Sequence, residues 1–545
     1  MFNFFEFSQF LFFMEYFLGI IILFILLVYM LIINNIFGLI ISQSINSLII
    51  FLFILIYYLI SNDIINFLID LKFNNFFINN NLIIFDLLSI IIKLLLIFLC
   101  CFFFLIIHDL LQDCNFNFLE FFIILLTNIL GLFLLLVSFD LLMIFVSIEL
   151  IGFSSYFLVS FKKNIYTIEC AFKYLIINVI SSILLLLGSF LFYYYFGTIE
   201  LNKIKIIFLT FNLQNMLINW NINILIYYYN YYFNYLEIFY LKSWFIEYLL
   251  KSNFFIIMDF NQVLIELGLI LICSSIFIKI GLVPYHFWVI EIYEKSNLII
   301  TFFLLIIPKL SFFVFLTRIT FFFNLSILSF YLIFIGVSSI IIGSLLNLNE
   351  KNLKSILIYS SINHSGYIIL GYSTTYLISL EIFFSYILIY LFSNLVIWFI
   401  ILNFKKNNNF IFYYCNNICD FALLNKSNKI IAFSLLFVIF SFSGIPPFIG
   451  FFLKYTIFLS VLKNDYIFVA LILAGCSFIS VFYYIRLVKI FYFENINFGY
   501  LYKPLYSFNS IILYLCLFAI IFLFINPTLF YLIIYKFILY NSIMF

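Results

Sequence analysis

Long apolar stretches recur along almost the whole chain, and most of them carry few charged side chains; residues 322–347, for example, carry none. A bilayer core of about 30 Å is crossed by about 20 predominantly apolar residues in a helix. Backbone polar groups must be satisfied within hydrocarbon, so only helices and closed barrels span it. Because apolar runs of this length favour helices, the sequence predicts an all-α, polytopic membrane helical bundle.

The lengths and spacing of these stretches predict about fourteen transmembrane helices. They fall near residues 12–41, 45–61, 83–107, 118–138, 141–161, 170–196, 261–284, 298–318, 322–347, 355–375, 379–403, 430–461, 465–490 and 508–538. The longest polar interval, 197–260, mixes asparagine with tyrosine. We favour a loop lying on the membrane interface, where Tyr and Trp are enriched, over a docking surface for a partner.

The composition excludes several classes of protein. Of 545 residues, 67% are hydrophobic and 9% are charged, against roughly 45–50% and about 25% in an ordinary soluble domain. The formal net charge of +2 provides no basic surface for nucleic acid. We therefore expect no nucleic acid among the partners, which should meet the chain within the bilayer or at its two surfaces, with lipids around the rest.

The residue preferences suggest where the chain is made. Phe (84) and Tyr (41) are abundant, as are Ile and Asn, whereas Gly (16) and Pro (6) are scarce. AT-rich codons specify the abundant residues, so we hypothesise an AT-rich organellar genome. The first residues, MFNFFEFSQF, lack the features of a secretory signal or of a transit peptide. Synthesis inside an organelle would explain both absences.

Two of the predicted spans contain prolines at corresponding places. Pro284 lies in 261–284, and Pro446 and Pro447 lie in 430–461, five spans later. Proline interrupts a helix, and paired interrupted helices are typical of inverted repeats, since an odd offset reverses the topology. We therefore expect two inverted five-helix repeats with broken helices, at 118–320 and 321–490. N-terminal helices over 1–117 and a C-terminal helix over 491–545 flank them.

Lysines in the short loops predict the orientation of the bundle. They follow the fifth, ninth and eleventh predicted spans, and therefore lie on one side of the membrane. These residues are Lys162, Lys163, Lys351, Lys354, Lys405, Lys406, Lys426 and Lys429. The lysine-rich side is expected to face the matrix or the cytoplasm.

Charged side chains within the predicted spans are the strongest indication of function. Lys279 and Lys309 lie in long apolar runs close to prolines, and Glu149 lies in the middle of the fifth span. Lys173 and Lys454 are two further lysines within spans. Ionisable groups in a membrane are costly and usually mark ion pathways. Because a nearby carboxylate favours the charged form of a lysine and burial disfavours it, a lysine whose partner moves away can release a proton.

Other interpretations of these charges stay open. Glu149 is also compatible with a static salt bridge that fastens two helices. Any single lysine can extend its side chain to the interface instead, most readily Lys173 and Lys454, which lie nearer the ends of their spans. His286 and His364 can extend the pathway through water, although a buried structural histidine is about as compatible with each position.

No redox cofactor or metal is expected in this chain. Six of the nine cysteines lie in apolar segments, and the only close pair in a polar loop, Cys415 and Cys419, has no neighbouring histidine. This spacing does not match a metal or iron–sulfur site. The sequence also contains neither a Gly-rich phosphate loop nor a dinucleotide fingerprint.

Several stretches around these charges resemble the antiporter-like subunits of respiratory complex I. They are DLLMIFVSIEL at 140–150, ECAFKYL at 169–175, KIGLVPYHFW at 279–288 with the following YE at 293–294, PK at 308–309, NLKSILIYSSINHSGY at 352–367 and SGIPPFIGFFLKY at 443–455. Together the similarities extend from position 86 to position 455. The match is specific in combination, because sister subunits of the family differ at just these places.

The resemblance implies roles in a proton pathway. Glu149 matches the fifth-helix glutamate of the family, and Lys279 matches the broken-helix lysine that pairs with it. Lys309 matches the eighth-helix lysine on the central axis. Lys173 is similar to the sixth-helix lysine, and Lys454 is similar to the lysine that leads protons towards the exit.

His286 and His364 match family histidines. This chain departs from the family pattern in two loops. Where the family reads DVYEG, this chain has EIYEKSNL at 291–298, so that Lys295 replaces a glycine. The interval 197–260 is longer than in the family. The departures affect loop structure and partner contacts, whereas the charges within the membrane are present.

By this resemblance the chain is expected to translocate protons as a multi-pass, organelle-encoded subunit of complex I in the mitochondrial inner membrane. Its expected partners are the neighbouring antiporter-like and accessory subunits. NADH, FMN, iron–sulfur clusters and ubiquinone are expected to bind other subunits, with no cofactor in this chain. Two alternatives remain: a free-standing cation/proton antiporter, and a structural membrane subunit whose charges only hold helices together.

Overall fold

A computed structural model gives the fold of most of the chain after the first 75 residues. It describes residues 76–78, 83–85, 87–114, 118–162, 164–208, 263–321, 326–373, 376–403, 405–408, 411–414, 417–422, 424–446, 448–493, 501–502 and scattered positions between 513 and 535. Nearly all of these residues are helical, which confirms the predicted fold class. The expected spans at 12–41 and 45–61 lie outside the described residues, and 508–538 is described only in part, so the count of fourteen stays a prediction.

The helices follow the predicted spans closely. In chain order they are α4 (Leu87–Cys114), α5 (Phe118–Val137), α6 (Leu141–Ser160), α7 (Ile165–Phe196), a helical segment at 201–208, an unlabelled helix over Val263–Ile280, α10 (Phe287–Lys295), α11 (Leu298–Phe321), α12 (Ser326–Leu346), α13 (Leu353–Ser373), α14 (Tyr376–Asn403), α15 (Leu424–Ser427), α16 (Lys429–Ser443), α17 (Ile449–Lys463) and α18 (Ile467–Tyr492). The expected interfacial loop at 197–260 is thus helical at 201–208, and its remainder from 209 lies outside the described residues. Two single 3₁₀ turns, Asn347–Asn349 and Ile418–Phe421, lie in connections.

The lengths and hydropathy of the helices agree with a bundle that spans a membrane. Within the described residues, eight helices are long and apolar enough to cross a bilayer, and two shorter apolar helices accompany them. The helix α13 has sufficient length but is not among the eight, because it contains many Ser, Asn, His and Gly residues; nearly all its residues are nevertheless buried. A polar helix of this kind is tolerated in a membrane where other helices surround it.

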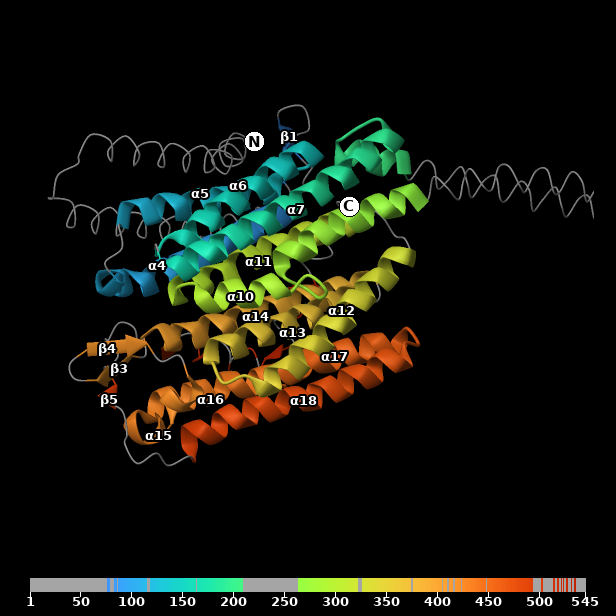
Figure 1. Cartoon of the computed structure of the whole chain (residues 1–545). Helices are drawn as coiled ribbons and strands as arrows, with labels where there is room; N and C mark the ends of the chain where they lie inside the picture. Colours follow the sequence, from blue (N-terminus) through green and yellow to red (C-terminus); the bar gives the residue numbers. More distant parts are fainter. Residues whose placement is uncertain are drawn as a thin grey trace, which may run out of the picture.

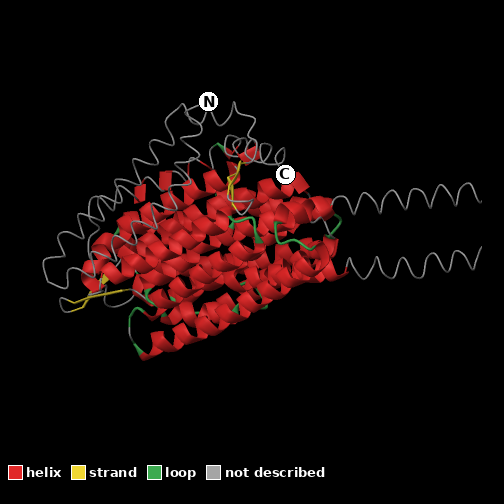
Figure 2. Ribbon diagram, turned by 90° about the horizontal axis from the view of Figure 1, so that it is seen from above, coloured by secondary structure: helices red, strands yellow, loops and turns green. Residues whose placement is uncertain are grey.

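The helices run side by side, as both views show (Figures 1 and 2). In Figure 1, the segments α4–α7 form one side of the bundle, α16–α18 form the other, and α10–α13 lie between them. The helix α11 is the centre of the first half, since it contacts α4, α5, α6 and α14. All residues of its apolar stretch Leu298–Thr320 are buried, so it has no surface for lipid within the described structure.

Both proline-containing spans are interrupted, as predicted. The first consists of the helix Val263–Ile280, an irregular turn, and α10. Gly281 has a φ of 81°, a left-handed conformation that suits glycine, and its N–H donates to the carbonyl of Phe277 at 2.9 Å. The second consists of α16 and α17, separated by a turn that contains Pro446; Pro447 lies outside the described residues.

The two halves repeat the same packing relations. In the first, α5 packs against α6, α6 against α7, and α11 returns to α5. In the second, α12 packs against α13, α13 against α14, and α18 returns to α12. Each half also contains one interrupted helix. These parallels agree with two repeats, while the boundaries at 118–320 and 321–490 stay a prediction.

Loops expected on one side of the membrane are joined at one end of the bundle. The Lys354 ammonium donates to the carbonyl of Glu294 at 3.1 Å, which joins the loop after the seventh span to the loop after the ninth. Asn352 pairs with Asn417, which adds the loop after the eleventh span. At the other end, the N–H of Leu141 donates to the carbonyl of Ile199 at 3.2 Å. The bundle therefore has one lysine-rich end, as the loop charges predicted.

The few strands are short and lie outside the helical bundle's core. Two form a hairpin, β1 (Phe76–Ile78) with β2 (Ile83–Phe85). The other three form an antiparallel sheet in the order β4-β3-β5, from β3 (Lys405–Asn408), β4 (Ile411–Tyr414) and β5 (Leu501–Tyr502). Since β3 follows the eleventh span and β5 follows the thirteenth, this sheet also belongs to the lysine-rich end.

The orientation is testable at Cys419, an exposed cysteine between α14 and α16. In sealed vesicles, we expect a membrane-impermeant maleimide to label Cys419 only when the lysine-rich end faces the reagent, which is the matrix or cytoplasmic face. Peptide mass spectrometry identifies the labelled residue, and Cys419→Ser removes the signal. Labelling from the opposite face would reverse the assigned orientation.

The break before α17 is testable at Gly444, whose φ is 77°. A Cβ there would lie 2.8 Å from Cδ of Lys454, and a non-glycine residue in this backbone region costs about 1–3 kcal/mol. We expect Gly444→Ala to lower the thermal unfolding midpoint. Gly475→Ala in α18 is the matched control, because no atom lies within 4 Å of the added methyl group. Equal midpoints for the two variants would contradict this account of the break.

Candidate site: a buried row of lysines

The first part of the site joins three helices at Lys279. The Lys279 ammonium donates a hydrogen bond to Oδ1 of Asn178 in α7. Nδ2 of Asn178 in turn donates to Oε2 of Glu149 in α6 at 3.3 Å. Lys279 and Asn178 are buried, and the second carboxylate oxygen of Glu149 is buried without a hydrogen-bond partner. Glu149 and Lys279 therefore meet through an asparagine and form no ion pair within 4 Å.

The interrupted helix provides a favourable position for the Lys279 ammonium. Lys279 lies in the last turn of the helix Val263–Ile280, where unpaired carbonyl groups give the helix end a partial negative charge. The Trp288 indole, from α10, donates to the carbonyl of Ile278 at 3.0 Å and closes the end of the helix. The break thus stabilises a cation and is itself held by an aromatic side chain.

The second lysine, Lys309, lies at the middle of α11 directly after Pro308. It is 2% exposed, and its ammonium donates to Oγ of Ser361 in α13 at 3.2 Å. No carboxylate pairs with it among the described residues. Lys309 is therefore a buried amine held by one neutral partner, an arrangement that is costly for a charged group.

The third lysine, Lys454, occupies the corresponding place in the second broken helix. Its ammonium donates to the carbonyl of Ser443, the last residue of α16, at 2.7 Å, and to Oγ of Ser480 in α18 at 3.3 Å. It also lies 5.6 Å from the ring centroid of Tyr367 in α13. Lys279 and Lys454 are thus both associated with the carbonyl end of a half-helix.

The polar helix α13 connects these lysines. Its Ser361 holds Lys309, and its Tyr367 lies beneath Lys454. Between these positions, Nδ1 of His364 lies 2.9 Å from the hydroxyl of Tyr386 in α14, and Nε2 lies 3.4 Å from the hydroxyl of Tyr484 in α18. His364 is buried, and in α13 it lies between the serine that holds Lys309 and the tyrosine beneath Lys454. Its role in passing a proton between these lysines stays a prediction.

A gap separates Lys279 from Lys309. Within the described structure, no hydrogen bond or ion pair joins the two lysines. Val283, in the break after Lys279, packs against Tyr359 and Ile362 of α13, which flank in the sequence the serine that holds Lys309. The break and the central lysine are thus neighbours through α13, and proton transfer between them would need water or side-chain movement.

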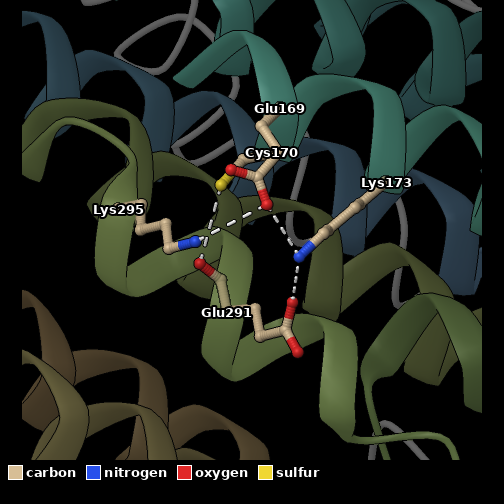
Figure 3. Close-up of polar contacts among 5 residues, drawn as sticks. All are labelled: Glu169, Cys170, Lys173, Glu291 and Lys295. Carbon is tan, nitrogen blue, oxygen red and sulfur yellow. Dashed lines mark hydrogen bonds and ion pairs between the residues drawn. The ribbon is translucent and has the colours of Figure 1, made fainter. Parts of the chain in front are cut away.

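The structure does not bring Lys173 into the buried row. Lys173 forms ion pairs with Glu169 at 3.0 Å and with Glu291 at 2.7 Å, and its side chain is 41% exposed. Lys295 lies 3.8 Å from Glu169, and the Cys170 thiol lies 3.7 Å from the carbonyl of Glu291. Figure 3 shows these residues of α7 facing those of α10. The cluster fastens α10, the half-helix beyond the break, to α7.

His286 lies at the start of α10, in the break itself. Its side chain is 2% exposed, and its Nδ1 has no hydrogen-bond partner. Its ring lies 4.2 Å from that of Phe287. The structure places His286 beside the first broken helix but joins it to none of the lysines, so its role in proton transfer stays a prediction.

Several polar residues of the site were not singled out in the sequence. Asn178, Ser361 and Ser480 contact Glu149 or the buried lysines, and Tyr386 and Tyr484 contact His364, in each case from a neighbouring helix. Asn178 could have been found from the sequence, because it places an amide in the middle of an apolar span. Serines and tyrosines are too frequent in this chain for their spacing to single out these members.

Arg318 is a further buried charge, which its position at the end of the predicted span 298–318 did not single out. It lies in α11, is 2% exposed, and donates to the carbonyl of Leu136 in α5. This contact ties the end of the central helix to the first helix of its repeat. No group of three or more metal-binding side chains occurs among the described residues.

Comparison with known proteins identifies the family. The model of the NADH:quinone oxidoreductase/Mrp antiporter transmembrane family matches residues 138–229 and 224–480. NADH-quinone oxidoreductase subunit N of Pelagibacter ubique is 28% identical over 381 residues, which are 69% of each chain. NADH-ubiquinone oxidoreductase chain 2 of Marchantia polymorpha is 28% identical over 428 residues, covering 77% of this chain and 76% of the relative.

Solved structures show the same fold. A chain of respiratory complex I from Thermus thermophilus superposes with a TM-score of 0.68 at 18% identity, covering 95% of this chain and 98% of its own length. A chain of the Mrp complex from Dietzia superposes with a TM-score of 0.56 at 18% identity, covering 76% and 68%. The family match extends over more than half of the residues, so the chain belongs to the NADH:quinone oxidoreductase/Mrp antiporter transmembrane family.

Proposed function

We propose that this chain is the proton-translocating membrane subunit of respiratory complex I that corresponds to mitochondrial subunit 2 and bacterial subunit N. It is a multi-pass, organelle-encoded protein of the mitochondrial inner membrane. NADH oxidation and ubiquinone reduction take place in other subunits, which bind NADH, FMN, iron–sulfur clusters and ubiquinone. Its partners are the neighbouring antiporter-like and accessory subunits, and it moves protons in response to them.

The buried row of Lys279, Lys309 and Lys454 carries this proposal. Three amines held mainly by neutral groups inside an apolar bundle are expensive to maintain and have little value for stability alone. Glu149, His286 and Tyr367 each have a buried polar atom without a protein partner, and such atoms are usually hydrated. These features support a partly hydrated path through the bundle.

In this mechanism, the state of Glu149 sets the affinity of Lys279 for its proton. When Glu149 draws away or becomes protonated, the ammonium of Lys279 loses electrostatic support and releases its proton through water to Lys309. The proton then passes by way of Ser361 and His364 to Lys454, at the second broken helix. Each interrupted helix serves one end of the path, with the two repeats meeting at α13.

Lys173 has a different place in this mechanism, outside the buried row. Together with Glu169, Glu291 and Lys295 it holds α10, which continues directly from the break after Lys279. We propose that this cluster influences proton transfer by positioning the break. Protons can also enter the path here, because the cluster is partly exposed near the start of α7.

The energies involved are compatible with one rearranged contact. Moving one elementary charge against about 100 mV requires about 2.3 kcal/mol. A hydrogen bond to a charged group contributes about 1.5–3 kcal/mol. The loss or gain of one such bond at Lys279 is therefore of the same size as the energy needed to move one charge across the membrane potential.

A free-standing cation/proton antiporter is the second candidate, because the family and the Mrp complex of Dietzia share this fold. The resemblance of 279–309 to complex I subunits favours the first candidate. A native gel of mild-detergent membranes, stained for NADH dehydrogenase activity, separates the two when mass spectrometry locates this chain. We expect it in the active high-mass band; a small separate species absent from that band would support the antiporter.

Replacement of the paired charges tests the mechanism. We expect Lys279→Met and Glu149→Gln each to lower coupled NADH oxidation and to lower proton translocation more strongly, by about tenfold or more, so that fewer protons move per electron; this factor corresponds to loss of one charge-assisted hydrogen bond. Assembly should be largely retained. The measurement is protons moved per electron in reconstituted vesicles.

Lys203→Gln provides a control for this test. Lys203 is 52% exposed and pairs with Glu200 at 2.8 Å on the surface, where an ion pair contributes little to stability. We expect this variant to translocate protons like the wild type. A normal proton stoichiometry in Lys279→Met or in Glu149→Gln would refute the proposed path.

A further inference from the structure

The Asn178 side chain occupies the space between the two charged groups of the first broken helix. Its Oδ1 accepts from Lys279, and its Nδ2 donates to Glu149. An amide has one acceptor end and one donor end, so it can satisfy an ammonium and a carboxylate at once. Both ends are used here in the only orientation that suits both charges.

The neighbouring helix leaves room for this amide. Gly152 of α6 lies against Asn178, and a Cβ at that position would overlap the Oδ1, Cγ and Nδ2 atoms of the asparagine. Asn178 itself is 4% exposed. The absence of a side chain at Gly152 therefore gives the amide its space between α6 and the helix that carries Lys279.

We propose that Asn178 is the positioning residue that couples Glu149 to Lys279, with Gly152 fixing its place. This inference rests on the proposed function as a proton path. While Glu149 is charged, it holds the donor end of the amide and thereby aligns the acceptor end with the Lys279 ammonium. When Glu149 is neutral or displaced, this alignment weakens and the ammonium is less supported. Hydrogen bonds in such a chain polarise one another, so the effect passes through the amide.

The competing interpretation is that Asn178 only fastens helices. Buried amides often do so, and Asn128 provides an example in the same bundle. Its Nδ2 donates to Oγ of Ser154 at 2.9 Å and to the carbonyl of Ile151 at 3.3 Å, joining α5 to α6 without contact to any lysine. Asn128→Leu is therefore a matched control for Asn178→Leu.

The experiment measures protons moved per electron in the assembled, reconstituted complex. Asn178→Leu preserves the approximate volume but removes both polar ends. We expect a decrease of about two- to tenfold, the range for loss of one net hydrogen bond. The double variant Glu149→Gln/Asn178→Leu should be no worse than the more severe single variant, since coupled groups are not additive. Asn128→Leu should lower the thermal midpoint and leave the proton stoichiometry unchanged.

A second pair of variants covers the case in which Asn178→Leu does not assemble. Gly152→Ala displaces the amide without changing any polar group of the path, and should lower the proton stoichiometry. Gly371→Ala is its control: the added methyl crowds Ile382 between α13 and α14, helices that carry neither Asn178 nor Gly152. It should affect stability alone.

The outcomes separate this inference from the proposed function. If the wild type pumps and Glu149→Gln is impaired, but Asn178→Leu and Gly152→Ala pump normally, the bridge is refuted and the path survives. Equal losses in Asn128→Leu and Asn178→Leu, or losses that multiply in the double variant, would also refute the bridge. If Glu149→Gln pumps normally, both the proposed function and the bridge through Asn178 are refuted.

Discussion

The cost of placing an ammonium group inside a bilayer determines much of this structure. An isolated buried charge is strongly unfavourable, so each lysine must be offered oxygen atoms by its surroundings. Lys279 obtains one from the Asn178 side chain, and Lys454 obtains one from the last carbonyl of α16, beside a broken helix. A continuous helix would bind that carbonyl group internally. The second break therefore serves the charge of Lys454, while neighbouring helices supply the polar partners of Lys279 and Lys309.

The same constraint explains why a polar helix is almost completely enclosed. The helix α13 carries Ser361, His364 and Tyr367, which approach the lysines, and it is shielded from lipid by its neighbours. Apolar helices such as α7 and α18 form the outside, with a third of the apolar stretch of each buried. The bundle thus places a polar axis inside an apolar shell, the reverse of a soluble protein's arrangement.

The first break also has a connection to the surface. Beyond it, α10 is held to α7 by the ion pairs of Lys173 and Lys295, and to the start of α13 by Lys354 and Asn352. These contacts lie at the lysine-rich end, where partner subunits or solvent can reach them. Since α10 continues from the turn after Lys279, a change at this end has a short mechanical route to the buried amide of Asn178. Exposed ion pairs are weak individually, which makes such a region adjustable.

The sequence by itself determined the membrane class, most helix boundaries, both interruptions and the positions of the charges, because apolar length, proline chemistry and intramembrane charge are local properties. It also indicated the lysine-rich end. It did not determine which charges meet. Lys173 resembles its fellow lysines in sequence, yet it lies on the surface among carboxylates. Glu149 and Lys279 meet through Asn178, and His364 lies between two tyrosines of different helices. Only tertiary structure decides such contacts, since the packing of helices distant in the sequence selects the partner of each polar side chain.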